Sequence, residues 1–450
     1  MPSGKARSAP VMDAGPTVNA AGRLRVLLVA EAANPRLTSV ALIGWSFSRA
    51  MAEAADAHLV SEQRNATDIA AADLGALRFT PINNRRWQGL AWNVGKALRG
   101  GTALGWTTYS ALGTLAYPFF EAKVWRAFRD RIRAGEFDLV HRVTPLAPVV
   151  PSLLARRCAR AGVPFIVGPL NGGVPWPKEF SGLRRAEKEW LSYVRGAYKL
   201  LPGVHATRRH AAAILVAART VWREMPARLR PKCVYLPENA IDVARFPRQA
   251  PPSLRSPVGV AFVGRFVPLK GVDMLLEAAA PLVRAGRLTL DLIGDGPELP
   301  RLRQLADELK IAAGTAFPGW VDHSQMAGRL GRSHIFGFPS VREFGGGVLL
   351  EAMARGLVPV VLDYGGPGEL VPPDAGFALP MASRAALIPS LRDCLTKLAA
   401  EPDRLRAMAV NAQDHVYRNF TWPAKVQQVQ AVYRWVLGRG PKPDFGMPLR

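Results

Sequence analysis

Two glutamates and three glycines in the C-terminal part of the chain have the types and spacing of a phosphate and sugar site. Glu343 and Glu351 lie eight positions apart and bracket the glycines at 345–347, which lead into a predicted helix. Glycines at a helix start expose backbone amides whose dipole favours an anion. Glu351, about two helical turns beyond Glu343, is expected on much the same side, where it can accept hydrogen bonds from sugar hydroxyls. The pattern favours a nucleotide-sugar; a glycine-rich turn with two solvated glutamates is the alternative.

A second candidate site combines two cations with the end of a predicted strand. Gly264, Arg265, Lys270 and Gly271 fall between that strand and a predicted helix. Open α/β sheets bind ligands at the carboxyl edge of their strands, so these cations suit a diphosphate. A solvated basic loop is the alternative. The glycine turn at 294–296 lacks the full Gly-x-Gly-x-x-Gly pattern and gives no support to nicotinamide binding.

Short apolar runs alternate with helical patterns in both halves of the chain, which predicts parallel βα units. The expected fold class is α/β, with two Rossmann-like doubly wound domains in series. The predicted parts are a disordered tail (1–22), a first domain (23–245), a proline-rich linker (246–257), a second domain (258–420), and a terminal helix with a frayed tail (421–450) that crosses back to the first domain.

Composition sets the broad class of the protein. With 450 residues, of which 49% are hydrophobic, the chain is long enough for two packed cores. Its three cysteines lack the spacing of a metal site or a disulfide framework, and no signal-peptide pattern is found, so a cytoplasmic protein is expected. Residues 100–120 carry no charge, but their Gly, Thr and Ser content favours a buried helix pair or an interfacial surface over a membrane span.

The net charge of +24 is unevenly distributed. Residues 258–420 contain 17 Lys+Arg and 17 Asp+Glu, so the whole excess lies outside them. Such an excess attracts an anionic membrane surface, nucleic acid or phosphorylated ligands, unless it reflects a generally arginine-rich composition. No recognition helix, zinc spacing or aromatic single-strand platform supports nucleic acid, which is not expected as a partner.

Six motifs occur in a fixed order in the second half of the chain, preceded by Pro237-Glu238-Asn239-Ala240-Ile241-Asp242. They are Gly264-Arg265 with Lys270-Gly271, Gly294-Asp295-Gly296-Pro297, Phe317-Pro318-Gly319-Trp320-Val321, Phe338-Pro339-Ser340, the pair Glu343 and Glu351, and Gly365-Gly366-Pro367-Gly368-Glu369. In this order they resemble the second domain of the retaining glycosyltransferase family 4. That family has two facing Rossmann-like domains in the GT-B arrangement.

The resemblance implies a role for each residue at the donor. Arg265 and Lys270 would hold the diphosphate, Glu343 would contact donor-sugar hydroxyls, and Glu351 would anchor the ribose. Arg265, Lys270 and Glu343 are also the implied catalytic residues. The other donor-binding residues implied are Gly264, Gly294, Gly319, Val321, Phe344, Gly345, Gly346, Val348 and Leu349.

The first domain departs from the family pattern. Members with a His-x-His step place the second histidine at the donor sugar, whereas this chain has Val143 there, so His141 or Arg142 would substitute. His141 is therefore the fourth candidate catalytic residue, with a hydrogen-bonded structural histidine as the alternative. The residues expected at the acceptor-side cleft are Arg142, Thr144, Asn171, Gly172 and Gly173.

The function predicted from this resemblance is transfer of a sugar, with retention, from a UDP- or GDP-sugar to a glycan or lipid-linked acceptor. Cell-surface polysaccharide or glycolipid synthesis is the expected context, at the inner face of the cytoplasmic membrane. The resemblance implies front-face displacement, and no metal or other cofactor is expected. The alternatives are a GT-B relative with epimerase or phosphorylase chemistry and a basic nucleic-acid-binding protein.

Overall fold

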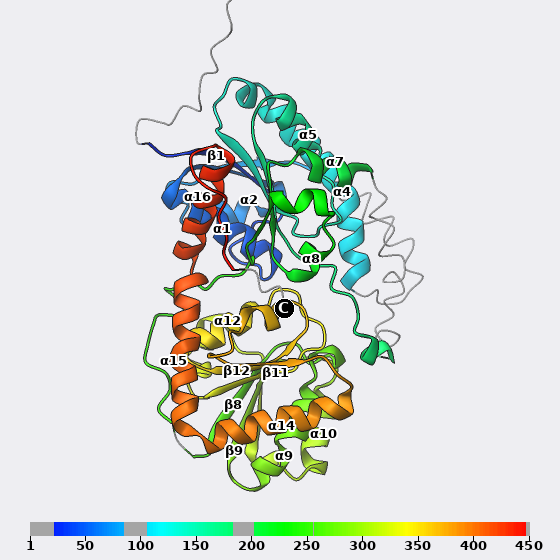
Figure 1. Cartoon of the computed structure of the whole chain (residues 1–450), viewed down its shortest axis with the longest axis vertical. Helices are drawn as coiled ribbons and strands as arrows, with labels where there is room; N and C mark the ends of the chain where they lie inside the picture. Colours follow the sequence, from blue (N-terminus) through cyan, green and yellow to red (C-terminus); the bar gives the residue numbers. More distant parts are fainter. Residues whose placement is uncertain (1–21, 85–105, 183–201, 255, 447–450) are drawn as a thin grey trace, which may run out of the picture.

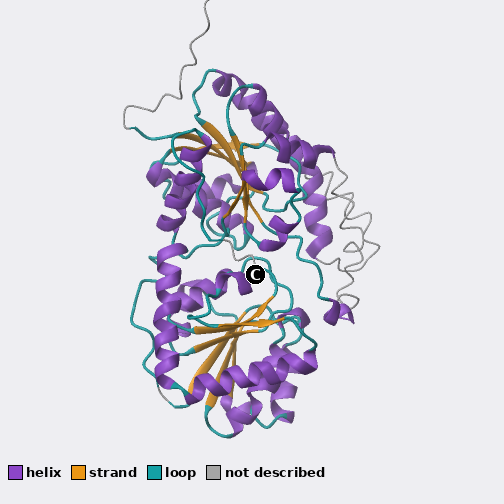
Figure 2. Cartoon of the chain, viewed as in Figure 1, coloured by secondary structure: helices purple, strands orange, loops and turns teal. Residues whose placement is uncertain are grey.

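The computed structural model describes residues 22–84, 106–182, 202–254 and 256–446. These residues form two α/β domains, one above the other in Figure 1, and each has its strands between layers of helices (Figure 2). The two Rossmann-like domains expected from the alternating pattern are confirmed.

The first domain is built on a seven-stranded parallel sheet in the order β3-β2-β1-β4-β5-β6-β7. Helices cover both faces of the sheet, so its strands are continuous apolar runs such as Val26–Ala30, which is fully buried. The strands are β1 (Arg25–Ala30), β2 (Asp56–Glu62), β3 (Arg78–Ile82), β4 (Leu139–Thr144), β5 (Phe165–Leu170), β6 (Ala213–Val216) and β7 (Cys233–Tyr235). The helices are α1 (Val40–Ala54), α2 (Ala66–Ala70), α4 (Trp106–Arg133), α5 (Leu153–Arg160), α7 (Pro202–His210) and α8 (Arg219–Arg223).

The second domain is built on a six-stranded parallel sheet in the order β10-β9-β8-β11-β12-β13. The strands are β8 (Val258–Val263), β9 (Leu288–Ile293), β10 (Thr315–Gly319), β11 (Ile335–Phe338), β12 (Val358–Asp363) and β13 (Phe377–Pro380). The helices are α9 (Val272–Arg284), α10 (Leu299–Glu308), α11 (His323–Leu330), α12 (Gly347–Ala354), α13 (Gly366–Leu370), α14 (Arg384–Ala400) and α15 (Pro402–Asn419), and the chain continues into α16 (Trp422–Val436).

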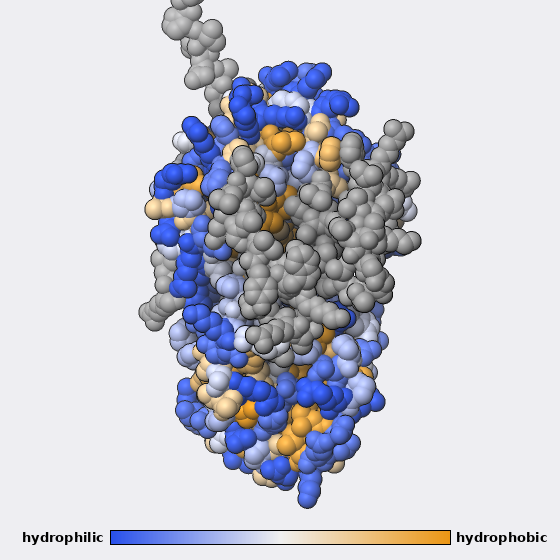
Figure 3. All heavy atoms as spheres, turned by 90° about the vertical axis from the view of Figure 1, so that its right-hand side faces the viewer, coloured by the Kyte–Doolittle hydropathy of each residue, from blue (hydrophilic) through white to orange (hydrophobic). Residues whose placement is uncertain are grey.

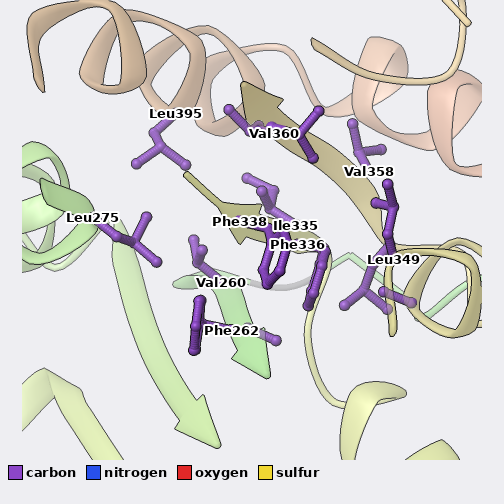
Figure 4. Packing of buried hydrophobic residues seen from close by; sticks show 14 of the residues in the cluster. Val260, Phe262, Leu275, Ile335, Phe336, Phe338, Leu349, Val358, Val360 and Leu395 are labelled. Atoms are coloured by element: carbon purple, nitrogen blue, oxygen red, sulfur yellow. The ribbon is translucent and has the colours of Figure 1, made fainter. Parts of the chain in front are cut away.

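Aromatic packing fixes the centre of the second domain. Phe338 stacks on Phe336 and on Phe262, with ring centroids 5.5 and 5.6 Å apart. Leu275 of α9 and Leu349 of α12 approach these rings from their helices (Figure 4). Because Leu349 is fully buried near the start of α12, its packing holds that helix start at the carboxyl edge of the sheet.

The chain crosses between the domains at two places that lie side by side. The segment after β7 pairs with the junction of α15 and α16 through a β-bridge between Ile241 and Thr421. The amide of Ile241 donates to the carbonyl of Phe420 at 2.7 Å. Beyond this junction α16 packs against α1 of the first domain, and α15 and α16 are seen along the side of the molecule in Figure 1.

A charged cluster joins the domains on their facing surfaces. The Arg219 guanidinium in α8 pairs with Asp363 and Glu369 of the second domain, and its backbone amide donates to the Glu369 carboxylate at 2.9 Å. Burial raises the pKa of Glu369 to about 7, against the opposing effect of Arg219. The relative position of the two sheet edges therefore depends on an ion cluster as well as on the chain crossings.

The uncharged stretch at 100–120 lies partly outside the described residues. From Trp106 it forms the first half of the single long helix α4, in which Tyr117 and Phe120 are buried and Phe119 is 40% exposed. Among the described residues, none of the helices is long and apolar enough to cross a membrane.

Tyr433 attaches α16 to the first domain, because its buried hydroxyl bonds Nδ1 of His141 at 2.7 Å. We expect Tyr433→Phe to lower the free energy of unfolding by about 1–3 kcal/mol, since a buried ring nitrogen then loses its partner. Denaturant melts should show the loss. Tyr364→Phe, which removes an exposed hydroxyl bonded to the Pro175 carbonyl, serves as the control. Equal stability of the two variants would contradict this role for Tyr433.

Candidate functional site

The facing edges of the two sheets enclose a cleft of about 1460 Å³. Both domains contribute to its lining. The residues expected at the donor that line it are Gly264, Arg265, Lys270, Gly294, Val321, Glu343, Phe344, Gly345, Gly346, Val348 and Glu351. Gly319 and Leu349 do not line it: the Gly319 carbonyl accepts the Gly294 amide at 3.0 Å, and Leu349 belongs to the core. Both support the donor half from behind, which corrects their expected direct role.

The glycine loop presents the bare start of α12 to this cleft. The helix begins at Gly347, so Glu343 precedes it instead of sharing its face with Glu351, as the sequence had suggested. Gly346 is the N-cap with φ of 64°, and no side chain caps the helix. A Cβ at Gly345 would collide with Glu238 and Asn239. A side chain is therefore disfavoured at both positions, and the helix amides stay available to an anion.

Lys270 and Glu343 form an ion pair at the donor half of the cleft. Lys270 lies over the Phe338 ring, 5.0 Å from its centroid, so the aromatic core also positions the ammonium group. Arg265 is exposed on the same side and forms no ion pair with any other described residue. The two cations, together with the start of α12, give this half of the cleft the electrostatics of a diphosphate site.

Glu351 has a partner that sequence reasoning missed. Its carboxylate lies 2.8 Å from Nε2 of His323, and both residues line the cleft. His323 begins α11, where Asp322 caps the helix by accepting the Ser324 amide at 2.8 Å. The sequence signal was present, because an Asp-x-Ser cap directly after a strand places the intervening histidine at the carboxyl edge of the sheet.

Three of the expected first-domain residues lie behind the cleft, which corrects their assignment. His141 is fully buried. Its Nδ1 is hydrogen-bonded to the Tyr433 hydroxyl, and its Nε2 is hydrogen-bonded to the Gly168 carbonyl at 2.7 Å. Burial lowers its pKa to about 4, so it is a neutral structural histidine and does not reach a substrate as a catalytic residue. Arg142 is buried and donates to the Val150 carbonyl at 2.9 Å. Thr144 is buried and bonds the Ala32 backbone at 3.1 Å.

The loop after β5 does reach the cleft, as expected for Asn171, Gly172 and Gly173. Asn171 donates to the buried carboxylate of Glu238 at 2.6 Å. Burial raises the pKa of Glu238 and lowers that of Lys425, the cation opposite it in α16, to about 7. Glu238 was missed as a site residue because only the fold brings its neighbours together.

A row of polar side chains at the ends of β1, β2 and β3 completes the first-domain wall. Glu31 follows β1 and pairs with Arg64 at 2.6 Å, and burial raises the pKa of Glu31. Asn84 follows β3, and its side-chain oxygen is buried without a hydrogen-bond partner. Glu31, Arg64 and Asn84 all line the cleft, and none of them was selected as a site residue from the sequence. In the described ranges, no cluster of three or more His, Cys, Asp or Glu has metal-binding geometry.

Comparison with known proteins identifies the family. Residues 248–414 match the family model described as glycosyl transferases group 1. A D-inositol 3-phosphate glycosyltransferase from Gordonia bronchialis is 33% identical over 184 residues, which are 39% of this chain and 39% of that enzyme. The alpha-maltose-1-phosphate synthase of Mycolicibacterium smegmatis is 30% identical over 270 residues, covering 54% of this chain and 68% of that enzyme. The chain belongs to this family. It is a group 1 glycosyltransferase, and the family 4 resemblance of its motifs is confirmed.

A solved structure supports the GT-B fold of this glycosyltransferase. The structure of HepE from Anabaena in complex with UDP matches with a TM-score of 0.59 over 90% of this chain and 98% of that one. Its sequence identity of 17% limits the likeness to the fold. The two domains of the group 1 glycosyltransferase therefore have the GT-B arrangement expected from the motifs.

Glu351→Ala is expected to weaken nucleoside diphosphate binding by roughly ten- to a hundredfold. A carboxylate hydrogen bond of this kind is worth about 1.5–3 kcal/mol, and the variant removes it. Calorimetric titration with UDP and GDP measures the change. The exposed Glu308→Ala in α10 is the matched control and should bind like the unmodified chain. If Glu351→Ala leaves the affinity of both nucleotides intact, Glu351 does not hold the ribose.

Proposed function

We propose that this glycosyltransferase transfers a sugar, with retention of anomeric configuration, from a UDP- or GDP-sugar to a hydroxyl of a glycan or lipid-linked acceptor. The observation that carries the proposal is the meeting of Lys270, Arg265 and the uncapped start of α12 in one cleft. An anion with two phosphates fits this combination of two cations and free amides. The UDP in the HepE structure is in line with such a donor.

The chemistry expected of these residues is electrostatic. The bond between the anomeric carbon and the diphosphate oxygen breaks while the acceptor oxygen bonds to the same face of the sugar. The acceptor proton passes to the departing phosphate, and Lys270, Arg265 and the α12 amides stabilise the negative charge that develops there. Glu343, which pairs with Lys270, is expected to contact sugar hydroxyls. The protein is expected to supply this stabilisation from its own cations, without a metal or another cofactor.

The first-domain half of the cleft supports a hydroxylated acceptor. Glu31, Arg64 and Asn84 offer carboxylate, guanidinium and amide groups, while Val149 and Leu146 add apolar surface. Carboxylate and amide groups can bond the hydroxyls of a glycan. A lipid-linked glycan of the cell surface, reached at the inner face of the cytoplasmic membrane, is the acceptor we propose. The comparisons favour neither the epimerase or phosphorylase alternative nor a nucleic-acid-binding protein.

Lys270→Ala should lower turnover by about 10²–10³-fold, because its charge is needed as the diphosphate leaves. Release of UDP or GDP from the matching sugar donor, in the presence of a glycan acceptor, reports the rate. The exposed Lys397→Ala in α14 is the control for loss of a lysine. Thermal melts of both variants show whether the fold is kept. Near-normal turnover of folded Lys270→Ala would show that the loop with Arg265 and Lys270 is only a solvated turn. It would also remove the main support for the proposed function.

A further inference from the structure

One side of the first domain carries a concentrated positive charge. It is formed by α5, α7 and the short 3-10 helix Ala227–Lys232, which together contain eight Arg or Lys residues and no Asp or Glu. Helices α5 and α7 pack against each other (Figure 1). Figure 3 views this side of the molecule and shows mainly hydrophilic side chains at the top of the first domain. We call this surface the basic face.

Several cations of the basic face lie close enough together to act on the same side chain, His210. Burial lowers the pKa of His210 at the end of α7, and Arg209, Arg156, Lys232 and Arg160 lower it further, in that order. The four cations come from all three elements of the face. The positive potential is therefore a property of the folded surface and not of a single run in the sequence.

Structural roles explain only some of these cations. Arg157 lies over the Trp125 ring at 5.7 Å, Arg230 lies over the Trp222 ring at 4.2 Å, and buried Arg208 donates to the Pro148 carbonyl. The cations that are left exposed, without an ion pair to any described residue, are Arg156, Arg160, Arg209 and Arg228.

The second domain differs in its balance of charges, because residues 258–420 contain 17 Lys+Arg and 17 Asp+Glu. Some of its exposed arginines, such as Arg301 and Arg384, pair with carboxylates, and others, such as Arg287 and Arg332, form no ion pair with a described residue. An arginine-rich composition without a purpose would give both domains the same kind of surface. The three elements of the basic face instead hold eight cations and no carboxylate, a local excess of charge that suits an anionic partner.

Exposed apolar side chains lie at the end of the basic face that is nearest the cleft. Leu153 begins α5 and is 39% exposed, and it shares one side of that helix with Arg156 and Arg160 at helical spacing. Phe119 of α4 is 40% exposed. Two residues beyond it, Glu121 accepts the Leu153 and Leu154 amides, which brings this part of α4 to the start of α5.

The same end of the face adjoins the cleft. Tyr117, two residues before Phe119, and Val150, three residues before Leu153, both line the cleft. Apolar side chains therefore lie beside the cleft, and the cations continue from them along α5 and α7. A bilayer interface takes up such a combination, with cations at the headgroups and apolar side chains at the acyl boundary.

We infer that the basic face docks on an anionic lipid bilayer, with Arg156, Arg160 and Arg209 at the headgroups and Phe119 and Leu153 at the interface beside the cleft. The inference rests on the proposed function, because docking of this kind would bring a lipid-linked acceptor to the cleft. A bilayer accounts for both the cations and the apolar pair beside the cleft, and nucleic acid, the other polyanion, is separated from it by the test below.

Flotation with two kinds of vesicle tests the inference. One kind contains equal parts of phosphatidylglycerol and phosphatidylcholine, and the other contains phosphatidylcholine alone. The full chain should float with the anionic vesicles only, and less as salt shortens the screening length to about 3 Å at 1 M. Binding to neither vesicle at low salt, or equal binding to both, would overturn the inference.

Charge reversal locates the docking surface. Arg156→Glu/Arg160→Glu should lower partitioning onto anionic vesicles by at least roughly thirtyfold, the equivalent of about 1 kcal/mol for each lost cation. Arg287→Glu/Arg332→Glu changes the net charge equally at exposed turns of the second domain and should bind like the unmodified chain. Equal losses in the two variants would show that net charge alone acts, which overturns the assignment to this face.

Two further readouts separate this inference from the proposed function. Both double variants should keep the affinity for UDP or GDP and the transfer rate to a water-soluble glycan, because none of the four arginines lines the cleft. If the unmodified chain shows no transfer at all but floats as expected, the proposed function fails and the docking surface stands. Leu153→Ser should also weaken flotation. Stronger retention on DNA than on anionic vesicles at the same salt would instead assign the face to nucleic acid and overturn the inference.

Discussion

The buried carboxylate of Glu238 is the point on which the two halves of the cleft depend. It accepts a hydrogen bond from Asn171 of the first domain and lies against Gly345 of the donor loop. Lys425 of α16, which acts on Glu238 electrostatically, lies just beyond the second chain crossing. A buried charge is costly unless it is compensated, so these groups must stay together in the folded protein. The donor loop, the first-domain loop and both crossings are thereby held at one place.

The donor half follows from packing behind it. The stacked rings of Phe262, Phe336 and Phe338 fill the core below β8 and β11, and Phe338 also supports the Lys270 ammonium. Leu349 anchors α12 in the same core. Core packing thus positions the proposed anion site, and preorganised charges of this kind lose little energy to reorganisation when charge develops during a reaction.

The sequence predicted local features well and long-range ones poorly. The two sheets and the donor loop could be found because strand periodicity, glycine turns and caps are encoded within short windows. His141 was misplaced because its burial depends on Tyr433, 292 residues away, and on the Gly168 carbonyl. Glu238 was read only as part of a linker motif, since its neighbours come from three distant segments. The row of Glu31, Arg64 and Asn84 required knowledge of which strands are adjacent.

Each part of the cleft already contains a partnered carboxylate. Glu343 pairs with Lys270, Glu351 with His323, and Glu31 with Arg64. An unpaired carboxylate at these partly buried positions would cost more than a paired one, so each pair holds its side chains in position. Phosphate oxygens could take the place of a carboxylate at a cation, and sugar hydroxyls could donate to the carboxylates. A ligand can therefore enter by exchanging partners, and the charged groups are never left without one.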